Sequence, residues 1–123
     1  MALPRDDPRR ALGASGEDLV ARWYESHGYR VLDRNWRCTD GELDLVARRD
    51  GVLVFCEVKT RSSNAYGVPA EAVTKGKARR IRRLAARWLA EERVRSPEVR
   101  FDVAAVRVSR GAPPKIDVIE AAF

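Results

Sequence analysis

The chain has 123 residues, enough for one ordinary domain with a real core and too few for two. Hydrophobic residues make up 45% and charged residues 34%, a balance that argues against a wholly disordered chain. Lysine and arginine number 24 against 18 aspartates and glutamates, and the sequence pI is about 9.9. This excess favours a polyanionic partner, either nucleic acid or an anionic membrane surface.

The sequence offers little for the membrane alternative. No apolar run is long enough to cross a bilayer, and the first ten residues lack the apolar stretch of a signal peptide. The two cysteines, Cys38 and Cys56, form no Cys-x-x-Cys motif and have no histidine nearby, which argues against a zinc site. We therefore expect a cytoplasmic protein with reduced thiols and no membrane partner.

The N-terminal third predicts a tail, a helix and a strand. Residues 1–12 carry prolines and charges without periodicity and predict a flexible tail. Ser15 and Asp18 have capping-box spacing, and apolar residues then recur at helical intervals until Gly28, which predicts a helix over residues 15–27. Residues 29–36 follow as a first strand. His27, at the helix end, is best explained as a packed or dipole-stabilising side chain.

Two further strands are predicted over residues 42–47 and 52–58. The Asp50-Gly51 turn joins them as a hairpin, and the continuously apolar second segment belongs in the middle of the sheet. Residues 62–69 predict a loop, and residues 70–95 a helix. The apolar stripe of this second helix consists of Ile81, Leu84, Ala85, Trp88 and Leu89.

The C-terminal part completes an α/β fold. Residues 100–108 alternate as a strand, residues 111–114 interrupt it, and residues 116–119 are a candidate fifth strand. The predicted order is αβββαβ, with a mixed central sheet flanked by helices, in a single domain over residues 13–123.

Three charged residues in otherwise apolar strands are the candidate active site. Glu57 and Lys59 share one strand face because side chains two apart point the same way. Asp44 lies 13 positions before Glu57, and the tight hairpin folds it back toward Glu57. Such charges are costly in a buried strand unless they serve a purpose. Two carboxylates and a lysine are therefore expected to converge.

The chemistry of this cluster suits a divalent metal. Mg²⁺ or Mn²⁺ takes hard oxygen ligands and often holds only one or two carboxylates, so Asp44 and Glu57 are the expected metal ligands. Glu17, on the first helix, is a candidate third ligand and catalytic residue. Lys59 would stabilise charge on a phosphate or orient the attacking water. The plainer alternative is that Glu57 and Lys59 form a structural salt pair, which is common for Glu-x-Lys on a strand.

The second helix is strongly basic on its outward side. A block of one sign, with no acid before Glu91, favours phosphate binding over an ordinary solvated face. Arg61, just after the third strand, would extend this surface. The predicted nucleic-acid-binding residues are Lys75, Lys77, Arg79, Arg80, Arg83, Arg87 and Arg61, with Arg82 also in the block.

Taken together, these motifs carry a family resemblance. The chain resembles the YraN-like family of predicted endonucleases and, more distantly, the archaeal Holliday-junction resolvases of the restriction-endonuclease-like PD-(D/E)xK fold. Leu43 stands where the superfamily motif has proline. The matching segments cover residues 13–17, 27–29, 34–37, 41–45, 55–61, 66–67 and 100–103.

The resemblance implies a restriction-endonuclease-like αβββαβ core, with Asp44, Glu57 and Lys59 on the motif positions and Glu17 on the helical glutamate. The leading hypothesis is a Mg²⁺- or Mn²⁺-dependent DNA endonuclease, with structure-selective cleavage as one form. The main alternative is a non-catalytic nucleic-acid-binding module that uses the basic helix over residues 75–95. A third is a docking domain for proteins or membrane surfaces. Cutting both strands would be simplest for a twofold homodimer, which the sequence leaves open.

Overall fold

In the part of the chain that the structure describes, five strands form one mixed sheet in the order β1-β2-β3-β4-β5, with two helices beside it. The computed structural model describes residues 8–62 and 73–123, with side chains described for residues 16–62 and 73–123. The αβββαβ order is confirmed, with a fifth strand added. The elements are α1 (Pro8–Ser26), β1 (Arg30–Cys38), β2 (Gly41–Arg49), β3 (Val52–Ser62), α2 (Lys75–Glu92), β4 (Glu98–Ser109) and β5 (Ala112–Ile119).

The predicted hairpin between β2 and β3 is confirmed. The strands pair antiparallel from Arg49↔Val52 to Leu45↔Cys56. Asp50 takes a left-handed conformation with φ 52°, which aspartate tolerates better than most residues. β3 then pairs parallel with β4, so β3 is the central strand, as its apolar sequence predicts.

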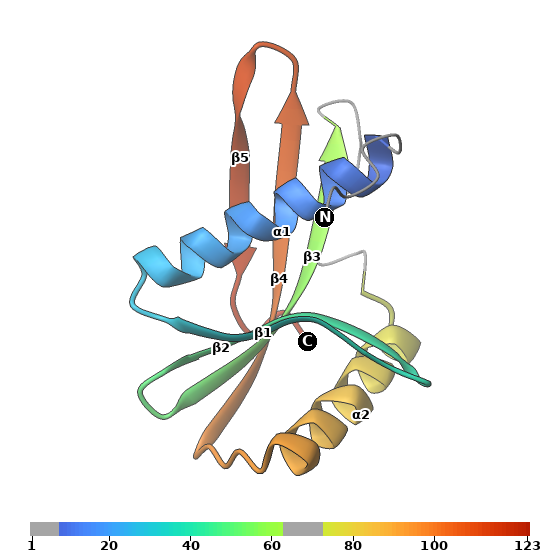
Figure 1. Ribbon diagram of the computed structural model, residues 1–123, viewed down its shortest axis with the longest axis vertical. Helices are drawn as coiled ribbons and strands as arrows, with labels where there is room; N and C mark the ends of the chain where they lie inside the picture. Colours follow the sequence, from blue (N-terminus) through green and yellow to red (C-terminus); the bar gives the residue numbers. More distant parts are fainter. Residues whose placement is uncertain (1–7, 63–72) are drawn as a thin grey trace, which may run out of the picture.

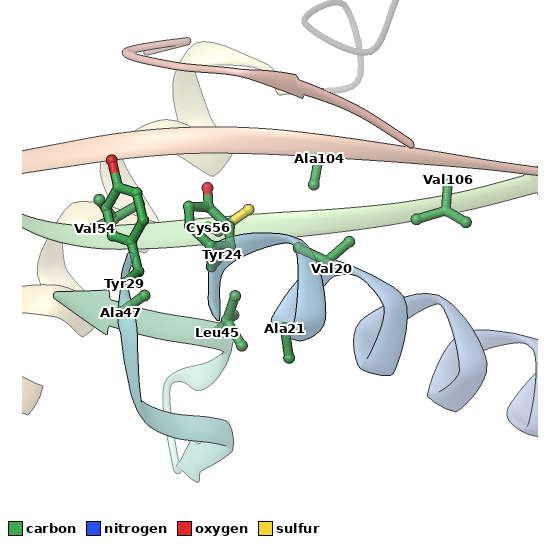
Figure 2. Close-up of a cluster of buried hydrophobic side chains, with 10 residues drawn as sticks. All are labelled: Val20, Ala21, Tyr24, Tyr29, Leu45, Ala47, Val54, Cys56, Ala104 and Val106. Atoms are coloured by element: carbon green, nitrogen blue, oxygen red, sulfur yellow. The ribbon is translucent and has the colours of Figure 1, made fainter. Parts of the chain in front are cut away.

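The helices cover opposite faces of the sheet. The packing of β3 shows this, since its alternate residues contact different helices. Val54 and Cys56 contribute to the cluster that contains Val20 and Tyr24 of α1 (Figure 2). On the other face lies the cluster that contains Phe55 and the α2 stripe. The predicted stripe is confirmed, with Ile81, Leu84, Ala85 and Trp88 buried and Leu89 partly buried.

Helix α1 is longer than the capping pattern predicts. It begins at Pro8, so residues 8–12, predicted as tail, belong to the helix. Proline fits the first helical position because its missing N–H has no partner there, and the Arg-Arg-Ala-Leu sequence that follows favours helix. Residues 1–7 lie outside the described residues. So does the predicted loop beyond Ser62, which itself ends β3.

The other boundary differences have local causes. Helix α2 begins at Lys75, after Thr74, whose hydroxyl accepts a hydrogen bond from the backbone N–H of Lys77 at 3.1 Å. It ends at Glu92 because Arg93 is left-handed. Strand β5 starts at Ala112, four residues earlier than predicted, despite Pro113 and Pro114. A strand at the sheet edge tolerates proline because one side of it needs no partner.

No helix in the described part of the chain is long and apolar enough to cross a membrane.

Candidate active site

The candidate site lies where the sheet forks. Pairing between β2 and β3 ends at Leu45↔Cys56, whereas β3 continues beside β4 as far as Ser62. Figure 1 shows the β1–β2 hairpin turning away from the end of β3 and toward α2. Asp44 and Glu57 are the first residues beyond the last pair. They line a pocket of about 410 Å³. Its charged lining consists of Glu17, Glu42, Asp44, Glu57, Lys59, Lys77 and Arg80.

Asp44 is a buried carboxylate with a strongly shifted pKa. Its side chain is held by the backbone N–H of Val58, which donates to Oδ2 at 2.9 Å. Only 8% of the residue is exposed. Burial, followed by the charge of Glu57, raises the pKa of Asp44 to about 7, although the hydrogen bond from Val58 acts to lower it. Both carboxylates lie directly beyond the last β2–β3 pair and line the same pocket, which confirms the predicted proximity of Asp44 and Glu57.

One carboxylate oxygen of Glu57 forms ion pairs with two lysines. Nζ of Lys59 lies 3.4 Å from Oε1, and Nζ of Lys77 lies 2.8 Å from the same atom. Burial and the neighbouring Lys77 lower the pKa of Lys59, against the attraction of Glu57. Burial also acts to lower the pKa of Lys77, but its close interaction with Glu57 acts the other way, and the pKa is raised overall.

Glu17 reaches the pocket because α1 packs very closely on β3. A Cβ atom at Gly16 would clash with the side chain of Thr60, so a larger residue there would force Thr60 or the helix to move, one residue from Glu17 and from Lys59. Burial raises the pKa of Glu17, while a hydrogen bond with the Asn35 side chain acts to lower it. Asn35 lies opposite Asp44 on β1 in a left-handed conformation, with φ 51°.

The donor set suits a cation held by two carboxylates and water. Within residues 16–62 and 73–123, no three histidine, cysteine, aspartate or glutamate side chains gather closely enough to enclose a metal ion. Asp44 and Glu57 are nevertheless hard oxygen donors in the number that Mg²⁺ usually takes from a protein, and the pocket that they line has room for water and phosphate. Glu17 as a third ligand stays a prediction.

The predicted basic surface divides into groups. Lys75, Arg79, Arg80 and Arg83 are exposed on α2. Arg87 pairs with Glu91 and Asp40, and Arg82 lies over the Phe101 ring, 4.5 Å from its centroid. Arg61 is partly buried on β3. The predicted outward position of Lys77 is wrong, because its side chain turns into the pocket.

Sequence reasoning also missed a second buried aspartate. Asp102, on β4, is fully buried, and its two oxygens accept hydrogen bonds from Arg100 at 2.8 and 2.9 Å. The hydroxyl of Tyr24 and the backbone N–H of Ala121 donate to it as well. The sequence did contain a signal. Asp102 is a charged residue in an apolar strand, and Arg100, two positions earlier, points to the same face.

Comparison with known proteins places the chain in a family. The model of the uncharacterised protein family UPF0102 matches residues 16–106. The chain belongs to this family. It is 57% identical to a UPF0102 protein of Beutenbergia cavernae, over 87% of this chain and 91% of the relative. It is 56% identical to one of Frankia casuarinae and 51% identical to one of Rhodococcus opacus, in both cases over 92% of this chain and 96% of the relative.

The family match covers the whole pocket. Glu17, Asp44, Glu57, Lys59 and Lys77 all lie within residues 16–106. The family is described as uncharacterised, so membership brings no activity with it. The function must therefore be argued from the chemistry of the pocket.

Proposed function

We propose that this protein is a metal-dependent endonuclease that hydrolyses phosphodiester bonds of DNA. The observation that carries the proposal is the convergence of Asp44, Glu57 and Lys59 in one pocket at the fork between β2 and β3. The raised pKa of Asp44 adds to it, because a buried carboxylate beside a second carboxylate is stabilised by a cation.

Each residue has a distinct task in this reaction. Asp44 and Glu57 would hold the metal, and the hydrogen bond from Val58 orients Asp44 toward the pocket. Bound Mg²⁺ or Mn²⁺ would supply an acidified water and neutralise charge on the phosphate. Lys59, partly buried beside Glu57, stabilises the charge that grows on the phosphate oxygens. Glu17 lines the same pocket from α1 and is the proposed further carboxylate.

The exposed face of α2 supplies the substrate-binding surface. Arg80 lines the pocket, and Lys75, Arg79 and Arg83 lie exposed on the same helix. Within the described residues, Arg79, Arg80 and Arg83 are in no ion pair with an acidic side chain, so their charge is available to phosphate. Contacts of this kind read backbone and shape more than base sequence, which fits a structure-selective enzyme.

A second function rests on a specific observation. Glu57 already has two lysine partners, so the same charges could serve as a structural ion network in a non-catalytic DNA-binding module. Such a module would bind DNA through α2, would not respond to metal and would cut no substrate. Both functions predict that affinity falls with salt, by a log–log slope of about −0.9 per phosphate contact.

Cleavage assays separate the two functions. The purified protein is incubated with labelled linear, flapped, single-stranded and four-way-junction DNA in Mg²⁺, in Mn²⁺ and in chelator. We expect metal-dependent products that disappear in Glu57→Ala and Lys59→Ala. Glu42→Gln is the matched control, because Glu42 lines the same pocket but is exposed and pairs with Arg37. It should retain cleavage.

The outcomes point in different directions. Loss of products in Glu57→Ala and Lys59→Ala alone supports the nuclease, and the substrate that is cut identifies its class. Intact DNA throughout, with salt-sensitive binding retained, would refute the nuclease in favour of the binding module.

A further inference from the structure

Lys77 differs from the other basic residues of α2 in the direction of its side chain. Lys75 and Arg79 flank it in sequence and are exposed. The Lys77 side chain instead enters the pocket, is 32% exposed and reaches Oε1 of Glu57 at 2.8 Å. This ion pair joins the start of α2 to β3 at the point where the pairing of β3 with β2 ends. Lys77 is thus part of the candidate active site.

The position of Lys77 is unfavourable for the helix itself. Thr74 is the N-cap, so Lys77 is the third helical residue, and the first turn contains no acidic residue. The N-terminus of a helix carries partial positive charge and favours aspartate or glutamate there. Glu57 compensates for this choice from another element. A locally unfavourable residue with a distant partner indicates a role beyond helix stability.

The ion pair and a metal ion place conflicting demands on Glu57. A Mg²⁺ ligand oxygen lies about 2.1 Å from the ion, so an ion on Oε1 would lie within about 5 Å of Nζ of Lys77 at its present distance of 2.8 Å. Two positive charges that close repel each other in a partly buried pocket. A metal ion on Oε1 and the Lys77 ammonium group would therefore each weaken the binding of the other.

We propose that Lys77 is an internal competitor for the metal position on Glu57, so that metal binding requires the Lys77 ammonium group to leave Oε1. This rests on the proposed function, since it assumes that Glu57 is a metal ligand. Lys77 neutralises Glu57 when no cation is bound and thereby sets the metal concentration at which the site becomes loaded. Competition of this kind weakens metal affinity without taking part in the reaction.

Geometry selects Lys77 over Lys59 for this role. Lys59 lies two residues from Glu57 on the same strand face and is farther from Oε1, at 3.4 Å against 2.8 Å. Lys77 comes from a different element. Its long side chain is partly exposed, so it can turn toward solvent while α2 keeps its place through the buried stripe.

The test measures Mn²⁺ binding without DNA, by the electron paramagnetic resonance signal of free Mn²⁺. Lys77→Gln should bind Mn²⁺ about tenfold more tightly than the wild type, in the usual range of coupling between two bound groups. Lys77→Met, which replaces the charged side chain with an apolar one of similar length, should also bind Mn²⁺ more tightly than the wild type. Lys77→Arg keeps a cation at this position and should stay close to the wild type.

Arg80→Gln is the matched control, because Arg80 lines the same pocket but has no ion pair with Glu57 among the described residues. It should change the affinity far less than Lys77→Gln, since it alters only the general charge of the pocket. Circular dichroism confirms that each variant is folded.

Two failures are distinguishable. Wild-type affinity in Lys77→Gln and Lys77→Met, or an equal gain in Arg80→Gln, would overturn the competition and leave the metal site standing. Absence of Mn²⁺ binding in the wild type and in every variant would overturn both the competition and the proposed metal-dependent nuclease.

Discussion

Asp44 and Asp102 are both buried aspartates of the central sheet, but their surroundings differ. Asp102 accepts hydrogen bonds from Arg100, Tyr24 and the backbone of Ala121. Asp44 accepts one from Val58 and otherwise faces a pocket that contains Glu57. A buried carboxylate with a matched cation serves the fold, whereas one beside another carboxylate has its charge disfavoured until a cation binds. The contrast supports the proposal that Asp44, and not Asp102, belongs to the active site.

The largest effect on stability is expected for a substitution of Asp102. Asp102→Asn removes the buried charge that pairs most closely with Arg100 and leaves the largely buried guanidinium with the exposed Glu120, at 3.7 Å, as its acidic partner. The free energy of unfolding should fall by about 3–5 kcal/mol in urea denaturation. Glu120→Gln is the control, because Glu120 is exposed and 3.7 Å from Arg100, and it should change stability by less than about 0.5 kcal/mol. If Asp102→Asn lowers the free energy of unfolding by less than about 1 kcal/mol, the structural role given to Asp102, and with it the contrast to Asp44, is wrong.

The same substitution at Asp44 should raise the free energy of unfolding instead of lowering it. The pKa of Asp44 is about 7 when folded, against an ordinary value of 3.8, so the folded state holds this proton more tightly than the unfolded state. The stability contribution of Asp44 therefore falls as the pH rises from about 4 to 7. Asn removes the buried charge and still accepts the hydrogen bond from Val58.

Asp44→Asn should accordingly stabilise the protein by on the order of 2 kcal/mol at pH 8. The gain should shrink as the pH is lowered toward 4, where the wild-type carboxyl is protonated in the folded state and partly protonated in the unfolded state. Urea denaturation at several pH values measures it. A variant that is less stable than the wild type at pH 8, or a difference independent of pH, would contradict this description of Asp44.

The smallest effect on stability is expected on the exposed basic face of α2. Arg83→Gln should leave the free energy of unfolding within about 0.5 kcal/mol. It should reduce the steepness of the log–log salt dependence of DNA binding by about 0.9. Arg87→Gln should change that slope less, because Arg87 is already paired with Glu91 and Asp40. Equal slopes in the wild type, Arg83→Gln and Arg87→Gln would show that this face of α2 does not bind DNA.

The site could be predicted in part because its geometry is local. A two-residue turn at Asp50 and Gly51 sets the register of β2 and β3, so a separation of 13 residues brings Asp44 back to Glu57. The face shared by Glu57 and Lys59 follows from strand periodicity alone. The stripe of α2 follows in the same way from helical periodicity.

The remaining features depend on contacts between distant elements. The fork between β2 and β3 depends on where the β1–β2 hairpin meets α2, and Gly41 approaches Leu84 there. The direction of Lys77 depends on Glu57, which lies on a different element, so helical spacing alone placed it outside. Asp102 was within reach of sequence reasoning, because Arg100 lies two positions before it in an apolar strand.

The most direct test of the central claim is DNA cleavage by Asp44→Asn at pH 8 in Mn²⁺, on the substrates that the wild type cuts. The variant should be folded and more stable than the wild type, should bind DNA with an unchanged salt dependence, and should cut nothing. Loss of activity then cannot be ascribed to loss of structure. Cleavage at the wild-type rate by this variant would contradict the claim that Asp44 and Glu57 form the active site.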